Sequence, residues 1–305
     1  MGLMALPDGD PQVDHRLMSS QIAVGYDGSS TSADAVRWAA AEAGCRNVRL
    51  RVVSCFEIPY LGGPMAGWAL TEATDSLRSA TEATALAMQR SISEEHPMVP
   101  VVTDVSPGPA ADVLTDGLTD GDLVVVGRSS RHGASAFWLG STPRNLVRHS
   151  PCPVVVISGA ATGGHPDRVV VGTDGSAASD AAVRWAAAEA DLHHVELVVV
   201  HSWEYPYLPA DVEGFSARDI THVDAACVLD CAVELARSSC GVQVTGRLVE
   251  DGSASGLLES VQDGDLLVVG SRGRGAIRTG LFGSTVNSLL ELADVPVAVV
   301  RKGPA

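Results

Sequence analysis

The sequence predicts an α/β protein built from two similar halves, each a doubly wound, five-stranded parallel sheet with helices on both faces. Residues 21–60 return as residues 168–207 at a constant offset of 147, with more than half of the positions identical. Residues 120–142 return as residues 263–285 at an offset of 143. Repeats of this length are whole domains rather than units of a solenoid. Within each half, short apolar runs without polar alternation separate longer helical stretches, which is typical of parallel strands buried on both faces.

The first half alternates strand and helix along its length. Its apolar runs are short and rich in β-branched residues, as strands are. The first helical stretch opens with Ser, Thr and Asp side chains suited to helix capping and continues as an alanine-rich run. The expected strands are Ile22–Val24, Val48–Val53, Val99–Val102, Leu123–Val126 and Val154–Ile157, and the expected helices are Ser29–Ala43, Thr71–Glu95, Ala110–Leu118 and Thr142–His149.

The second half repeats this order, and right-handed crossovers should connect its parallel strands. We expect a disordered leader at residues 1–19, one domain at 20–158, a linker at 159–166 and a second domain at 167–302. The linker is rich in glycine and small residues. The expected strands of the second half are Val169–Val171, Leu197–Val200, Val242–Leu248, Leu266–Val269 and Val297–Val300.

Composition excludes several classes of function. A formal net charge of -16 repels phosphate backbones and anionic lipids, so we expect no nucleic-acid partner. The chain has a single lysine, Lys302, close to the end of the sequence. Walker-A nucleotide binding and Schiff-base chemistry both need a lysine inside a folded site, so both are excluded.

We expect a cytoplasmic protein without a membrane span. The first twenty residues lack a basic region followed by an apolar one, and no run reaches the ~18 apolar residues of a membrane span. The six cysteines form no C-x-x-C pair and have no histidine at zinc-finger spacing, which fits a reducing cytosol. Cys227 and Cys231 stand four residues apart, but two thiolates are only half of a tetrahedral metal site.

The loops after the first and fourth strands could hold a ligand, because such sheets bind ligands beyond the carboxyl ends of their strands. Gly270, Gly273 and Gly283 should permit positive φ and close backbone approach. Ser284 and Thr285 open a helix whose N–H groups and dipole favour phosphate. Asp174, after the first strand, could accept hydrogen bonds from ribose hydroxyls or hold Mg²⁺ through water. Each loop alone is also an ordinary turn, and their placement together at one sheet edge favours a binding site.

With these residues the chain resembles a tandem member of the universal stress protein family. Nucleotide-binding members carry G-2x-G-9x-G-[ST] after strand four, and Gly270, Gly273, Gly283 and Ser284 fit this pattern without a gap. The VGxDGS start, the alanine-rich first helix and the PVxVV last strand recur in both halves. The resemblance covers nearly the whole chain and implies a Rossmann-like sheet of the adenine nucleotide alpha hydrolase type.

The resemblance implies ATP in the second half, usually accompanied by Mg²⁺, although no dedicated metal ligand set is readable. Asp174 would contact the ribose or adenine side, and Ser202 would approach the adenine through its backbone. The phosphates would lie against Gly270, Gly273, Gly283, Ser284 and Thr285.

The first half departs from the pattern. The corresponding positions are Asp27, Cys55, Gly127, Ser130, Gly140, Ser141 and Thr142, so a serine replaces the second glycine of the motif. Pro143 also removes an N–H near the helix start. We therefore expect weaker nucleotide binding in the first half.

Other polar residues have simpler interpretations. His201, at the end of a strand, could be a base, but the first half has Ser54 there, which favours a structural role. Trp38 and Trp185 recur at helical spacing and are expected in the core. Arg272 and Arg274 could pair with triphosphate or lie in solvent.

Three functions compete: a nucleotide-dependent regulator, a slow ATPase or adenylyl-transferring enzyme, and a structural module that acts only by association. No nucleophile with an adjacent base is readable, which favours binding with little or no turnover, and the complete second-half loop argues against the purely structural module. The last strands, residues 153–157 and 296–300, are apolar, and the resemblance implies that they lie at sheet edges, where unpaired backbone groups invite pairing. In tandem members of the family they build an internal pseudo-dimer, and pairing of two chains is a further expectation.

Overall fold

The structure, a computed structural model, describes residues 20–57, 66–128, 139–158, 164–204, 217–273 and 283–301. The expected leader, Ser130, Arg274, Lys302 and the first five residues of the expected linker lie outside these ranges. The first half contains β1 (Gln21–Gly25), α1 (Ser30–Arg46), β2 (Arg49–Phe56), α2 (Ala66–Glu95), β3 (Val101–Pro107), α3 (Ala110–Thr115), β4 (Leu123–Gly127), α4 (Ser141–His149) and β5 (Val154–Ile157). The second half contains β6 (Arg168–Gly172), α5 (Ala177–His193), β7 (Glu196–Trp203), α6 (Ala217–Arg237), β8 (Val244–Glu250), α7 (Ser253–Leu258), β9 (Leu266–Gly270), α8 (Ser284–Leu292) and β10 (Val297–Val300).

Each half forms the expected doubly wound sheet. The strand order is β3-β2-β1-β4-β5 in the first half and β10-β9-β6-β7-β8 in the second, with parallel pairing throughout each half. β5 and β10 match their expected runs fully, and most other strands match within three residues at each end. The third strand was misplaced, because β3 shares only Val101 and Val102 with the expected run.

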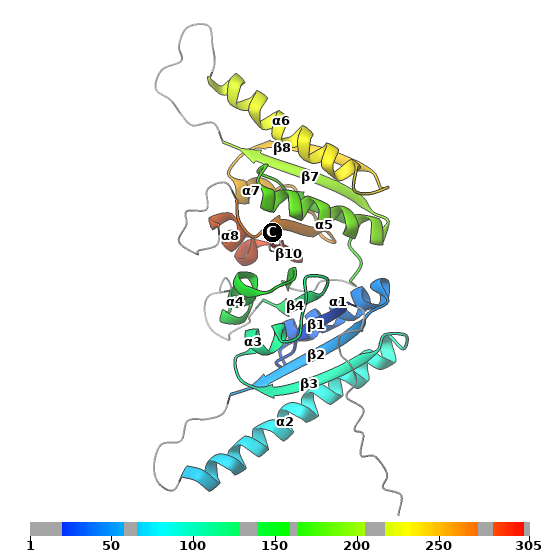
Figure 1. The fold of residues 1–305 in the computed structure, drawn as a ribbon, viewed down its shortest axis with the longest axis vertical. Coiled ribbons are helices and arrows are strands. Elements are labelled where there is room, and N and C mark those ends of the chain that lie inside the picture. Colours follow the sequence, from blue (N-terminus) through cyan, green and yellow to red (C-terminus); the bar gives the residue numbers. More distant parts are fainter. Residues whose placement is uncertain are drawn as a thin grey trace, which may run out of the picture.

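The two halves share one continuous sheet, because β5 pairs with β10 in antiparallel orientation. Val155 faces Ala298 in this register, so the last strand of the first repeat pairs directly with the last strand of the second. Figure 1 shows the result: the halves lie end to end along the long axis, with α2 and α6 at opposite ends. The sequence analysis expected these two edge strands to attract a partner, and within the chain the backbone groups of β5 and β10 hydrogen bond to each other.

Two apolar layers hold the helices to the sheet. One joins α1, α2, α5 and α6 to one face, through side chains such as Val36, Ile92 and Val183. The other joins α3, α4, α7 and α8 to the opposite face, through side chains such as Leu146 and Leu289. Neighbouring strand residues alternate between the two layers because side chains of a strand point to opposite faces.

The first helix of each half begins with a serine cap, and the cap occurs at the same position in both sequence repeats. Ser29 accepts a hydrogen bond from the backbone N–H of Ser32 at the start of α1, and Ser176 does the same for Ser179 in α5. Trp38 is buried in the core and Trp185 packs against it, as expected. None of the described helices combines the length and apolar character needed to cross a bilayer.

Candidate functional site

A cavity of about 280 Å³ opens at the carboxyl ends of β6 and β9, the neighbouring strands from which the chain winds in opposite directions. This is the position at which doubly wound sheets bind ligands. The volume is near the lower end of the range for small-molecule sites. All seven second-half residues that the sequence analysis selected line it: Asp174, Ser202, Gly270, Gly273, Gly283, Ser284 and Thr285.

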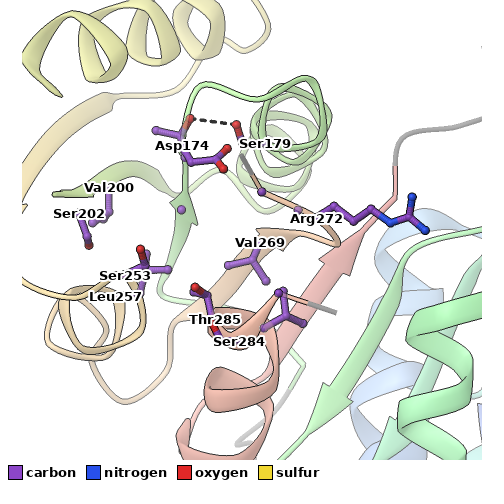
Figure 2. Close-up of a pocket in the computed structure, with 16 residues that line it drawn as sticks. Asp174, Ser179, Val200, Ser202, Ser253, Leu257, Val269, Arg272, Ser284 and Thr285 are labelled. Carbon is purple, nitrogen blue, oxygen red and sulfur yellow. Dashed lines mark hydrogen bonds between the residues drawn. The ribbon is translucent and has the colours of Figure 1, made fainter. Parts of the chain in front are cut away.

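Three elements, β6, β7 and α8, position the polar groups around this cavity (Figure 2). Asp174 follows β6, Ser202 lies near the end of β7, and Ser284 and Thr285 form the first turn of α8. Asp174 accepts a hydrogen bond from the backbone N–H of Ser176 at 3.0 Å, which fixes one carboxylate oxygen at the turn before α5. In Figure 2 Asp174 and the α8 residues lie on opposite sides of the cavity.

The start of α8 borders the cavity, and within the described residues no N-cap side chain covers its first N–H groups. Its N-cap residue is Gly283, so no side chain caps the helix, and its first turn carries no acidic residue. A Cβ built on Gly283 would meet no atom of the described chain within 4 Å. The first N–H groups of a helix have no partner within the helix, and they carry the positive end of its dipole. The cavity therefore has a built-in preference for an anion on its α8 side.

Two glycines of the motif, Gly270 and Gly273, act through close approach, and none of the three motif glycines has the positive φ that the sequence analysis expected. A side chain on Gly270 would place Cβ 2.8 Å from the carbonyl oxygen of Ala178 in the first turn of α5. A side chain on Gly273 would place Cβ 2.5 Å from Oδ2 of Asp174. Positive φ occurs instead at Gly175, where φ is +70° in the turn after Asp174. Gly270 is thus required for packing, whereas Gly273 leaves room for the carboxylate.

Ser202, which lines the cavity, carries an unsatisfied polar atom packed beside Gly256 of α7. Its Oγ is buried and has no hydrogen-bond partner among the described residues. A buried hydroxyl without a partner costs free energy, so a hydrogen bond from a ligand would be favoured here. The sequence analysis gave a role to the backbone of Ser202 and missed this hydroxyl.

Several lining residues escaped the sequence analysis. Ser253 begins α7 on the same side as Ser202, and Thr173 hydrogen bonds through its hydroxyl to Ser179 at 3.3 Å. Apolar walls come from Val200, Leu257 and Val269. Of these residues, only Ser253 gave a signal in the sequence, because it follows an expected strand. The remaining lining residues look like ordinary core and helix-capping residues in the sequence.

His201 and Arg272, two residues that the sequence analysis left with alternative roles, are placed differently relative to the cavity. The ring of His201 hydrogen bonds through Nδ1 to the carbonyl of Thr173 at 2.7 Å, and Ser54 makes the corresponding bond to Tyr26 at 2.8 Å. His201 therefore ties β7 to the turn after β6. Arg272 lines the cavity, but its exposed side chain points away from Asp174 and Ser284 in Figure 2.

A smaller cavity of about 160 Å³ occupies the corresponding place in the first half. Of the residues selected there, Asp27, Cys55, Gly127, Gly140, Ser141 and Thr142 line it, and Ser130 lies outside the described residues.

Its chemistry differs from that of the larger cavity. Cys55 replaces the hydroxyl of Ser202, and burial, with the Asp104 charge nearby, raises the pKa of the Cys55 thiol to about 11. Pro143 stands in the first turn of α4 where α8 has Val286 and an N–H. Burial raises the pKa of Asp27, but hydrogen bonds from Ser29 and Ser32 together lower it below the ordinary value.

Comparisons with known proteins point to one family. The model of the universal stress protein family matches residues 18–158 and again residues 166–301. A universal stress protein of Mycolicibacterium smegmatis is 30% identical over 92% of this chain and 96% of its own length. Universal stress protein Rv2623 of Mycobacterium tuberculosis is 32% identical with the same coverage. A crystal structure of a universal stress protein from Archaeoglobus fulgidus, 19% identical, superposes with a TM-score of 0.69 over 93% of this chain and 98% of its own, and shows the same fold.

Proposed function

Since the chain belongs to the universal stress protein family, we propose that its second half binds ATP together with Mg²⁺ and that the protein is a nucleotide-dependent regulator in the stress response. Turnover of the nucleotide is little or none. The two domains span residues 20–158 and 167–302, and the protein acts in the cytoplasm. Pairing of β5 with β10 supports an internal pseudo-dimer, and association of two chains stays a prediction.

The observation that carries this proposal is the uncapped N-terminus of α8 at the cavity wall. Gly283 has no side chain to cover the N–H groups, and Ser284 and Thr285 add hydroxyls beside them. A phosphate chain placed there would receive backbone hydrogen bonds and interact favourably with the helix dipole. Gly273 would admit the nucleotide beside Asp174 without a Cβ in the way.

The other side of the cavity suits a nucleoside. Asp174 presents a carboxylate that can accept hydrogen bonds from ribose hydroxyls. The Ser176 N–H binds one of its oxygens and thereby holds the carboxylate in position. The buried Oγ of Ser202 and the apolar side chains of Val200 and Leu257 offer one polar and two apolar contacts to a base. The distribution of groups therefore matches a ligand that is charged at one end and largely apolar at the other.

Mg²⁺ fits this donor set as a companion of the phosphates. Among the described residues that line the cavity, Asp174 is the single carboxylate. Mg²⁺ commonly keeps several waters and binds through one or two carboxylates plus substrate phosphates. When bound, the ion would neutralise phosphate charge, and Ser284, Thr285 and Asp174 are the residues available to hold its waters.

Low turnover follows from what lines the cavity. The described lining residues include one arginine and one carboxylate, and no histidine, lysine or cysteine. Phosphoryl transfer depends on positioned cations and a residue that orients the nucleophile. Binding without efficient hydrolysis is therefore the function that this set supports best.

The experiment is to identify nucleotide released from the purified full chain by denaturation, using mass spectrometry, and then to titrate the stripped protein with ATP and Mg²⁺. A Gly273→Glu variant places a carboxylate where Asp174 already lies. Ser130→Glu, at the corresponding position of the first half, is the matched control. Release of phosphate is followed in the same samples.

ATP in the parent and in Ser130→Glu, with its loss in Gly273→Glu, is the expected result. Absence of nucleotide and of binding on titration would instead favour a module that acts by association alone. Multiple turnovers well above the rate without protein would favour an ATPase.

A further inference from the structure

Three metal-binding side chains from distant parts of the chain meet at the junction between the two halves. Cys45 lies near the end of α1, His193 ends α5, and His165 belongs to the segment that leads into β6. One ligand atom from each lies within 4.8 Å of the others. Cys45 and His165 are 120 residues apart in sequence, so no spacing motif could have revealed the cluster.

The distances suit a common tetrahedral metal ion. Zinc binds imidazole nitrogen at about 2.0–2.1 Å and thiolate sulfur at about 2.3 Å, so tetrahedral angles place two nitrogens about 3.3 Å apart and sulfur about 3.6 Å from nitrogen. The Nδ1 atoms of His165 and His193 are 3.2 Å apart. The Sγ of Cys45 lies 3.5 Å from Nε2 and 3.9 Å from Nδ1 of His165. Nδ1 of His165 is the nitrogen near both partners, and the exposed His165 ring would have to bring it about 0.3 Å closer to Sγ to reach the tetrahedral distance.

A buried carboxylate orients one of the ligands. Glu42 Oε2 lies 3.0 Å from His193 Nε2, and their side chains are 0% and 1% exposed. A proton on Nε2 is held by this carboxylate, which leaves the lone pair of Nδ1 directed toward His165. Metal-binding histidines usually donate their other N–H to a carboxylate in this manner. Glu42 therefore prepares His193 as a ligand.

The local charges also call for a cation. Glu42 and Glu189 are both buried, and Arg46 forms ion pairs with both of them. With both carboxylates ionised and His193 neutral, the two carboxylates and the guanidinium carry a net charge of about -1, which is costly in a buried site. A divalent ion bound to one thiolate adds +1. The metal and the carboxylate cluster would thus neutralise each other.

We propose that Cys45, His165 and His193 bind a zinc-type divalent metal ion, with water in the fourth position, and that this ion clamps the two halves together. A thiolate with two imidazoles is a donor set typical of zinc among the biologically common divalent ions. The site lies at the amino-terminal edge of the sheet, since α1 and α5 run back from the carboxyl edge where the proposed nucleotide cavity opens. The proposal is independent of nucleotide binding.

The competing arrangement contains no metal. An N–H···N hydrogen bond between the two imidazoles, beside a neutral thiol, would satisfy the same atoms. Metal binding and its ligand chemistry must therefore be measured directly.

The test uses tag-free full-length protein, freed of metal with a chelator under reducing conditions and then titrated with Zn²⁺ and, separately, with Co²⁺. Cobalt reports its ligands, because a bound thiolate adds a charge-transfer absorption band in the near ultraviolet. The variants are Cys45→Ser and His165→Ala. His165→Ala alters an exposed side chain and leaves the buried Glu42–His193 contact intact. The matched controls are Cys227→Ser and His222→Ala, which change exposed residues of α6.

One equivalent of metal per chain, with the thiolate–cobalt band, is the expected result for the parent and both controls. Cys45→Ser should lose the band and weaken Zn²⁺ binding at least tenfold, and His165→Ala should weaken it to a similar extent. Zn²⁺ should raise the thermal unfolding temperature of the parent but not of these two variants. Circular dichroism without metal confirms that the variants are folded. Failure to bind, cobalt binding without the band, or equal binding by all variants would overturn the proposal.

Discussion

Replacing Gly283 by aspartate should separate the stability of α8 from its use as an anion site. Gly283 occupies the N-cap position with φ -56° and ψ 140°, a conformation that a capping residue adopts readily, and its Cβ would meet no described atom within 4 Å. Aspartate at an N-cap is better than glycine by a few tenths of a kcal/mol, and the helix dipole adds about 0.3–1 kcal/mol. We expect Gly283→Asp to raise the free energy of unfolding by about 0.5–1 kcal/mol.

The same substitution should greatly weaken ATP binding. The new carboxylate would occupy the N–H groups proposed for phosphate, and a hydrogen bond to a charged group contributes about 1.5–3 kcal/mol. That loss alone corresponds to about a 10- to 150-fold weaker Kd. Repulsion between the carboxylate and a phosphate about 4 Å away, at an effective dielectric constant of about 20, adds up to about 4 kcal/mol.

The assay combines thermal unfolding without nucleotide and calorimetric titration with ATP and Mg²⁺. Gly140→Asp is the matched control, because Gly140 also begins a helix without a side-chain cap, in the first half. It should stabilise the protein to a similar extent while the second-half Kd is retained. If Gly283→Asp bound ATP as tightly as the parent does, the reasoning about α8 would be refuted.

Three further predictions follow from the packing and the titrating groups. Gly270→Ala should lower the free energy of unfolding, measured in urea, by about 1–3 kcal/mol, because its Cβ would meet a backbone carbonyl of α5 at 2.8 Å. Gly273→Ala should instead weaken ATP binding with little change in stability, because its Cβ would meet only a side-chain oxygen, Oδ2 of Asp174. Equal unfolding curves for the two variants would contradict this. The pKa of Asp27 is lowered in the folded protein from its usual value of 3.8, so its ionised form stabilises the fold above that pH, and this contribution is lost as pH falls through the folded value. Between pH 5 and pH 3, about the range over which carboxylates titrate, the thermal unfolding temperature of Asp27→Asn should therefore fall less with acid than that of the parent. Parallel pH profiles of the two proteins would rule this out. Iodoacetamide at neutral pH should label the exposed Cys227 before Cys55, because the Cys55 thiol, with a pKa of about 11, stays protonated. Peptide mass spectrometry measures the order of labelling, and the reverse order would show that Cys55 is accessible and ionised.

The strands and the binding edge could be predicted because each depends on local signals. Buried parallel strands read as continuous apolar runs, and Val154–Ile157 and Val297–Val300 were bounded correctly for this reason. The cavity residues were found because the carboxyl ends of β6 and β9 meet at one edge of the sheet. The residue ranges of the long strands β3 and β8 were shifted, since the exposed ends of these outer strands lack an apolar signal.

Features that depend on how the halves meet could not be read in the sequence. The roles of Gly270 and Gly273 were assigned to φ, but they arise from contacts with α5 and Asp174 that only the folded chain brings close. The sequence analysis judged the cysteines by their spacing along the chain and found no histidine partner for Cys45, which meets His193 in the folded protein. These two residues meet only because β5 pairs with β10 and places α1 beside α5.

The account depends most on a phosphate chain at the start of α8, and a crystal structure grown with excess ATP and Mg²⁺ tests this directly. The account predicts electron density for the triphosphate against the N–H groups that follow Gly283, with the ribose near Asp174. A second-half cavity without nucleotide, or phosphates placed away from α8, would contradict it.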